Sequence, residues 1–236
     1  MSQDAPSLAA TRPDEDPPQG NKPRMSRQAT SWLITALLVV VVIASIFIFN
    51  GLANRATHAP TGPTALLGID LGAAPAPDIT LKDQNGQTIQ LSQLHGRPVV
   101  LTFIDSYCPP YHQMCQLTAV GLRIAVKNLG AQANQATWLA VSVNAADTPA
   151  SATAFLKNNG VTFPLHYLLG TQAQLTPIWN AYHIYSAPDP VDKGVIDHST
   201  YIYIIDQQGR ERVVLDAGAV TDPHQITNDV QYLLAH

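Results

Sequence analysis

An uncharged stretch of 18 residues, WLITALLVVVVIASIFIF at residues 32–49, divides the chain into two parts of different character. It contains no proline, and its length falls within the roughly 17–25 residues that cross a bilayer as a helix. We therefore predict a transmembrane anchor helix over residues 29–51. A cleaved signal peptide is the rival interpretation, but its apolar region usually spans about 7–15 residues, and Ala53 and Ala56 make a poor cleavage site.

The charges that flank this stretch predict its orientation. Lys22, Arg24 and Arg27 lie shortly before it, whereas Arg55 alone follows it closely. Lys and Arg concentrate on the cytoplasmic side of membrane proteins. We therefore expect a single-pass protein of the cell membrane, with a cytoplasmic N-terminus and an extracytoplasmic C-terminal domain.

Composition separates the segments on either side of the anchor from the rest of the chain. Residues 1–28 are rich in Pro, Asp, Gln and Ser, which predicts a disordered cytoplasmic tail. Residues 52–73 contain Pro and Gly breaks and are predicted to be a linker. Residues 74–236 remain, which is the size of one ordinary domain.

Overall composition excludes several classes of function. The 236 residues carry a formal charge of −4 and a pI near 6.0, with no basic stripe, so we expect no nucleic-acid partner. Two cysteines are too few for a disulfide-built scaffold. A hydrophobic core must therefore stabilise the domain, and a hydrophobic content of 46% can supply it.

The domain begins with two strand signals. ITLKD and QTIQLS alternate around Asn85 and Gly86, a pair that favours a tight hairpin turn. PVVLTFI at residues 98–104 is short, apolar and rich in β-branched residues, as in a strand that is buried on both faces. Both cysteines of the chain follow this strand directly.

The remaining segments continue the alternation of strands and helices. We predict helices over 115–129, 151–160, 175–185 and 222–236, a strand at 137–144, and a second hairpin around Gln208 and Gly209. Pro177 is expected only near the first turn of its helix. This order predicts an α/β, thioredoxin-like fold, with an N-terminal β-hairpin and a central mixed sheet flanked by helices.

The spacing of the cysteines constrains their local structure. On a continuous helix, Cys108 and Cys115 would lie about 10.5 Å apart along the axis, whereas a disulfide needs Cα atoms about 4.4–6.8 Å apart. The two prolines after Cys108 disfavour a helix that begins there. We expect a loop that brings the thiols together, followed by a helix from about residues 111–114. A structural disulfide, a redox pair and a metal site all remain open.

Four segments together resemble the Sco/SenC family of membrane-anchored, thioredoxin-fold copper proteins. They are TFIDSYCPPYHQMC at 102–115, VSVNAADTP at 141–149, GTQAQLTPIWNAYHIY at 170–185 and DHSTYIYIIDQQGR at 197–210. The resemblance covers about residues 75–234. It implies a site for Cu(I) or Cu(II) made of Cys108, Cys115 and His198. It also implies a partner, either the CuA-bearing subunit of a cytochrome c oxidase or another copper chaperone.

The chain departs from the family pattern at two places. Six residues separate its cysteines, where the family has three, and the longer loop brings in His112 and Met114. Imidazole and thioether are both plausible copper ligands, so His112 and Met114 are candidates to supplement or compete with His198, with packing the favoured role for Met114. Asn144 stands where the family usually has an acidic residue, and Asp147 is a candidate substitute.

Two functions follow from these residues. The first is delivery of copper to the CuA site, or preparation of that site's thiols, by a metallochaperone rather than an enzyme. The alternative is a thiol-disulfide oxidoreductase, in which Cys108 attacks an extracytoplasmic partner and Cys115 resolves the mixed disulfide. A peroxiredoxin is disfavoured because Asp105 occupies the position of its characteristic threonine.

Overall fold

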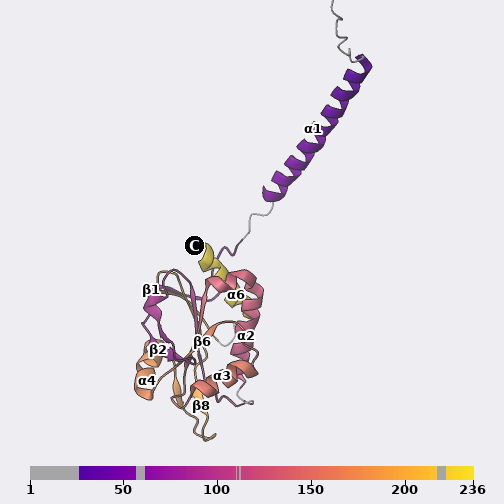
Figure 1. Cartoon of the computed structure of the whole chain (residues 1–236). Coiled ribbons are helices and arrows are strands. Elements are labelled where there is room, and N and C mark those ends of the chain that lie inside the picture. Colours follow the sequence, from indigo (N-terminus) through magenta and orange to yellow (C-terminus); the bar gives the residue numbers. More distant parts are fainter. Residues whose placement is uncertain (1–26, 57–61, 110, 112, 217–221) are drawn as a thin grey trace, which may run out of the picture. The chain divides into compact units, whose positions relative to one another are not determined.

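The computed structural model describes residues 27–56, 62–109, 111, 113–216 and 222–236, and the chain forms two units, Met1–Ala59 and Pro60–His236 (Figure 1). The first unit contains helix α1 (Arg27–Ala56), whose side chains are described at Trp32 and at residues 36–49. Its large apolar side chains, such as Leu37 and Phe49, are exposed. No helix is both long and apolar enough to cross a membrane over the part of the chain that is described.

The structure describes only part of the N-terminal region for which predictions were made. The anchor helix predicted over 29–51 falls inside α1. Residues 1–26, which make up nearly all of the predicted tail, lie outside the described residues, as do residues 57–61 of the predicted linker.

The second unit is built on an eight-stranded mixed sheet in the order β1-β10-β9-β4-β5-β6-β2-β3. Its strands are β1 (Ile69–Pro75), β2 (Thr80–Asp83), β3 (Thr88–Gln90), β4 (Val99–Ile104), β5 (Thr137–Ser142), β6 (Leu165–Leu169), β9 (Ile202–Ile205) and β10 (Arg210–Leu215). The three strands β4, β5 and β6 are parallel, and the other pairings are antiparallel. A separate two-stranded ribbon joins β7 (Ser186–Pro188) to β8 (Ile196–His198).

Helices cover both faces of the sheet (Figure 1). They are α2 (Met114–Leu129), α3 (Pro149–Asn158), α4 (Gln172–Ala181) and α6 (Pro223–Ala235), with short 3-10 helices η1 (Leu91–Gln93) and η2 (Gly130–Gln135). The side chains of α2, α3 and α6 pack in one hydrophobic cluster, and those of α4 and η1 pack in the other. The sheet is therefore the middle of three layers, as predicted for a thioredoxin-like α/β domain.

Strand β4 shows why its sequence is apolar at every position. Val100 and Ile104 point into the cluster under α2, whereas Val99, Leu101 and Phe103 point into the cluster under α4. Successive side chains of a strand point to opposite faces, and both faces of β4 are covered. The prediction of a strand buried on both faces is confirmed, because all six residues of β4 are buried.

Turns and caps predicted from the sequence also hold. Gly86 and Gly209 adopt φ angles of 80° and 76° in the two hairpins, a region that glycine enters without steric cost. Asp222 accepts a hydrogen bond from the backbone N–H of His224, and Pro223 is the first residue of α6. Both features are typical of a helix start.

Three details differ from the sequence predictions. Strand β1 begins at Ile69, inside the predicted linker, because it pairs with β10 and becomes an edge strand of the sheet. Strand β6 separates α3 from α4, where two consecutive helices were predicted. Helix α4 begins at Gln172 after a capping box at Thr171, so Pro177 lies in its second turn and not near its first.

Candidate functional site

The sheet topology brings three loops together at the edge of the sheet where the parallel strands β4 and β5 end. The chain leaves β4 toward Cys108 and leaves the parallel neighbour β5 toward Asn144. Strand β9 runs antiparallel to β4, with Thr102 paired to Ile202, so the segment that precedes β9 reaches the same edge. The hydroxyl of Thr102 fastens this segment by donating to the carbonyl of Tyr201 at 3.1 Å. His198, at the end of β8, lies in this segment.

Cys115 and His198 are in direct contact at this edge. The Nε2 atom of His198 lies 3.3 Å from the Sγ atom of Cys115. The Nδ1 atom of the same ring lies 3.0 Å from the carbonyl oxygen of Ser199, which fixes the orientation of the imidazole. Cys115 is 1% exposed and accepts a hydrogen bond from the backbone N–H of Asp105.

Cys108 completes the group from the opposite side of the loop. It is partly exposed and hydrogen-bonds to the side chains of Cys115 and His198 and to the backbone of Cys115. The side chain of Gln116 donates to the carbonyl of Cys108 at 2.8 Å and so ties the loop to α2. Helix α2 begins at Met114, so the prediction of a loop that folds the thiols together before the helix is confirmed.

The two thiols differ in acidity because their surroundings differ. The hydrogen bond from Cys115 outweighs the cost of burial and, with the hydrogen bond and charge of His198, lowers the pKa of Cys108 to about 5. The same hydrogen bond, together with burial, raises the pKa of Cys115. Near neutral pH, Cys108 is therefore the thiolate and Cys115 the thiol.

His198 responds to that thiolate. Burial disfavours its cation, but the hydrogen bonds to Cys108 and to the Ser199 carbonyl outweigh burial and raise the pKa of His198. The imidazole thus gains positive character next to the Cys108 sulfur. A thiolate beside a histidine cation is the usual environment of a reactive cysteine.

The buried carboxyl group of Asp105 is close enough to Cys115 for its charge to act on that thiol. Asp105 is 1% exposed and accepts hydrogen bonds through Oδ1 from the backbone N–H of Tyr107 and from the amide of Asn144. Its Oδ2 has no hydrogen-bond partner. Burial is the main reason why the pKa of Asp105 is raised. Asn144 therefore serves as a donor to the acid that directly follows β4, and a second acid at position 144 would repel it.

Asp147, in the loop after β5, binds residues around the cysteine loop through its carboxylate. Its carboxylate accepts hydrogen bonds from the hydroxyls of Ser142, at 2.6 Å, and Tyr167, at 2.8 Å, and from the hydroxyl and backbone N–H of Ser106. Ser142 is the last residue of β5, Ser106 lies in the loop after β4, and Tyr167 is in the middle of β6. Asp147 is thus a structural support beneath the cysteine loop, whereas Asp105 is the acid nearest the sulfurs.

An open groove of about 470 Å³ exposes one side of the site. It is lined by Cys108, Tyr111, Gln113, Met114, Leu117, Ile196, Asp197, His198 and Thr200. Cys115 does not line the groove, so a partner that enters it meets the Cys108 thiolate first. Of the predicted candidates, His112 lies outside the described residues.

The side chains of Cys108, Cys115 and His198 are held together by hydrogen bonds. Among the described residues, no group of three or more His, Cys, Asp and Glu side chains is placed to hold a metal ion. Donors bonded to one ion at about 2.0–2.3 Å in tetrahedral geometry lie about 3.6 Å apart, whereas the N–S contact here is 3.3 Å. Ligation would require these two side chains to separate by a few tenths of an ångström.

Comparison with known proteins identifies the family. The sequence model described as SCO1/SenC matches residues 72–235, which is more than half of the chain. The chain belongs to the SCO1/SenC family. The match runs from Gly72, inside β1, to Ala235 in α6 and so covers nearly all of the thioredoxin-like domain.

Solved structures support the same fold. ScoI of Bradyrhizobium japonicum, a structure with copper bound, has a TM-score of 0.54 and 24% identity, covering 64% of this chain and 99% of that one. The apo Sco1 protein of Thermus thermophilus has a TM-score of 0.60 and 20% identity, covering 72% and 97%. At these identities the likeness shows the fold.

A curated relative carries a different activity in its name. The thiol-disulfide oxidoreductase ResA of Bacillus subtilis is 30% identical over 113 residues, which cover 48% of this chain. The match spans 56% of the length of ResA. It shows that part of this chain is similar in sequence to part of ResA.

Proposed function

We propose that this SCO1/SenC protein binds copper through Cys108, Cys115 and His198 and delivers it to the CuA site of a cytochrome c oxidase, directly or through another copper chaperone. The observation that carries the proposal is the 3.3 Å contact between His198 and Cys115, with Cys108 hydrogen-bonded to both. Copper bound in the structure of the Bradyrhizobium ScoI supports the choice of ion.

The chemistry of these donors fits copper. Thiolates are soft ligands that select Cu(I), and an imidazole added to them can also hold Cu(II). Cys108 is already ionised near neutral pH because its pKa is lowered to about 5. Cys115 must release its proton before its sulfur can bind, and His198 must free Nε2. Loading should therefore release protons and weaken in acid.

We further propose that α1 anchors the domain to the cell membrane. Its described side chains from Leu37 to Phe49 are exposed, and all except Ser45 are apolar. The excess of Lys and Arg before the apolar stretch favours a cytoplasmic N-terminus. This orientation places the cysteines outside the cytoplasm. A test is protease protection in sealed membranes, where cleavage of the domain only from the cytoplasmic side would contradict the orientation.

Copper transfer can be tested with a purified CuA domain as acceptor. The reduced, Cu(I)-loaded protein is mixed with the metal-free CuA domain, and copper is measured in each protein after separation. We expect copper to move to the acceptor from the wild-type protein. The protein in which His198 is replaced by Ala should not retain Cu(I) during loading and should therefore deliver none. Retention of all copper by the wild-type protein, with the acceptor thiols reduced, would contradict delivery.

The second candidate function is thiol-disulfide exchange, favoured by the lowered pKa of Cys108 and by the name of the ResA relative. The Cys108 thiolate would attack a partner disulfide, form a mixed disulfide and expel one partner thiolate. Deprotonated Cys115 would then attack the Cys108 sulfur, break the mixed disulfide and expel the second partner thiolate. The partner gains two electrons, and Cys108 and Cys115 become the disulfide.

Single cysteine variants separate these steps. Replacement of Cys115 by Ala should trap a mixed disulfide at Cys108, because the resolving sulfur is missing. Replacement of Cys108 by Ala should abolish reduction of the partner altogether. A mixed disulfide trapped at Cys115 in the Cys108→Ala variant, or reduction of the partner that survives in that variant, would contradict these roles.

A further inference from the structure

Met114 stands on the wall of the groove that exposes Cys108 and His198. It is the first residue of α2 and directly precedes Cys115. Successive residues of a helix point about 100° apart, so these two side chains take different directions. Cys115 is buried at 1% exposure, whereas Met114 and Leu117, which is one turn further on, both line the groove.

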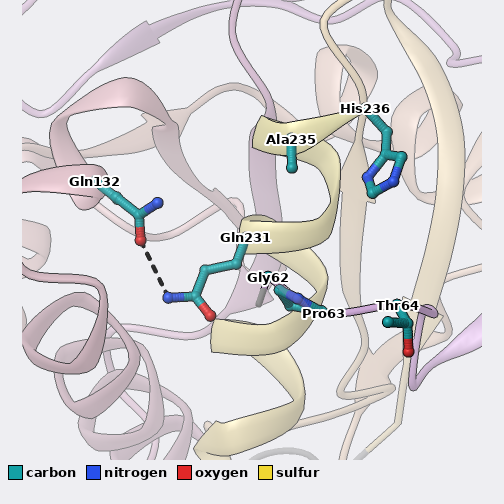
Figure 2. Close-up of a pocket in the computed structure, with 7 residues that line it drawn as sticks. All are labelled: Gly62, Pro63, Thr64, Gln132, Gln231, Ala235 and His236. Atoms are coloured by element: carbon teal, nitrogen blue, oxygen red, sulfur yellow. Dashed lines mark hydrogen bonds between the residues drawn. The ribbon is translucent and has the colours of Figure 1, made fainter. Parts of the chain in front are cut away.

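The groove consequently gathers three donors that favour copper. They are the thiolate of Cys108, the imidazole of His198 and the thioether of Met114, and soft thioether sulfur is a ligand that selects Cu(I). Asp197 is the single carboxylate among the groove-lining residues. The larger hollow beside α6, about 680 Å³, has no sulfur and only one imidazole, that of His236 (Figure 2).

We propose that the Met114 thioether is an additional copper donor, which binds from the groove side to an ion held by Cys108, Cys115 and His198. The inference rests on the proposed copper function. Met114 also packs against the core under α2. Its three rotatable bonds allow the sulfur to turn toward the groove while the stem stays packed.

Binding of copper by the Met114 sulfur can be measured directly, because Met114 is the one methionine of the domain. The chain has three methionines, and Met1 and Met25 both precede the domain. The full-length protein is produced with selenomethionine, reduced, and loaded with one equivalent of Cu(I). X-ray absorption at the copper edge should then show a copper–selenium path. The same preparation with Met114→Leu should lack that path, although selenium remains at positions 1 and 25.

A second measurement is the affinity for Cu(I) in competition with a chromophoric chelator. Met and Leu have similar volumes, so Met114→Leu should fold. We expect it to bind Cu(I) about tenfold more weakly, a typical effect of losing one modest interaction. Met25→Leu is the matched control, with the same change of atoms outside the domain, and should bind like the wild type.

The outcomes separate this inference from the proposed function. A protein that loads Cu(I) stoichiometrically but shows no copper–selenium path overturns the role of Met114 and leaves copper binding intact. Unchanged affinity in Met114→Leu overturns it as well. Failure of the wild-type protein to bind Cu(I) overturns both proposals.

Discussion

Cys115 and His198 lie 83 positions apart in the sequence, and the Sγ atom of the first lies 3.3 Å from the Nε2 atom of the second. The antiparallel pairing of β9 with β4 produces this contact, because it carries the start of β9 to the edge at which β4 ends. The contact gives the buried thiol an imidazole neighbour and leaves Cys108 as the sulfur that faces the groove.

The acidity of the two thiols predicts a large difference in alkylation. The pKa of Cys108 is lowered to about 5, so its reaction with iodoacetamide should stay near its maximum from about pH 8 to about pH 6 and decline toward pH 5. Buried Cys115, whose pKa is raised, should remain unmodified in the native protein. Mass spectrometry of the modified peptides measures both rates, and a Cys108 midpoint near pH 9 would contradict the assignment.

The same lowered pKa predicts how stability depends on pH. From about pH 5 to the ordinary thiol range near pH 8.5, the unfolded chain holds a proton on Cys108 that the folded chain lacks. This group therefore adds stability as the pH rises through that window, and the addition is lost as the pH falls toward 5. Replacing Cys108 by Ser should flatten the pH dependence of the unfolding free energy between pH 5 and pH 6, measured by urea denaturation. In this range His198, whose pKa is raised in the folded chain, holds its proton in both states and adds no slope. An unchanged slope would argue against a native thiolate.

Asp147 should be important for stability although it lies outside the groove. Asp147→Asn replaces one acceptor oxygen with an NH2 group. This group faces the Ser106 hydroxyl if it takes the place of Oδ1, or the hydroxyls of Ser142 and Tyr167 if it takes the place of Oδ2. We expect a loss of about 1–3 kcal/mol of unfolding free energy. Asp70→Asn is the control, because Asp70 is exposed and its one hydrogen bond, from Gly72, needs only an acceptor. Equal effects of the two changes would show that the Asp147 network is not structural.

Asn144→Asp tests the pairing with the buried acid. The variant places a second carboxyl group where an amide now donates to Asp105 at 3.1 Å. Repulsion should add to burial, which already raises the pKa of Asp105. Raised folded-state values favour the protonated form, so the loss of stability should be small in acid and grow as the pH rises. Unfolding at pH 5 and pH 8 measures it, with the exposed turn variant Asn85→Asp as control.

Much of this arrangement follows from local sequence patterns. The apolar run of β4, the Gly turns and the two prolines after Cys108 each fix local structure through sterics or burial. The proline argument also predicts the loop that brings the cysteines together. His198 is placed by the family resemblance and by its position just before a predicted strand.

Other features depend on tertiary contacts that local patterns do not encode. Strand β6 has only five residues and contains His166, whose ring contacts Asp83 of β2, so its sequence lacks a clear strand period. Strand β1 is largely exposed along its length and is held by pairing with β10. The roles of Asp105 and Asp147 arise where three loops meet. Asp105 directly follows the buried strand β4, which was its sequence signal, whereas Asp147 was a candidate only through the family resemblance.

The most direct test of the central claim is a competition titration of the reduced, full-length protein with Cu(I) and a chromophoric chelator. We predict one tightly bound Cu(I) per chain, with tight binding lost in Cys108→Ala, Cys115→Ala and His198→Ala. His166→Ala is the control. It removes an imidazole on β6 that contacts Asp83 of β2, and it should bind like the wild type. Weak binding by the wild type, or tight binding that survives in all three site variants, would contradict the proposal.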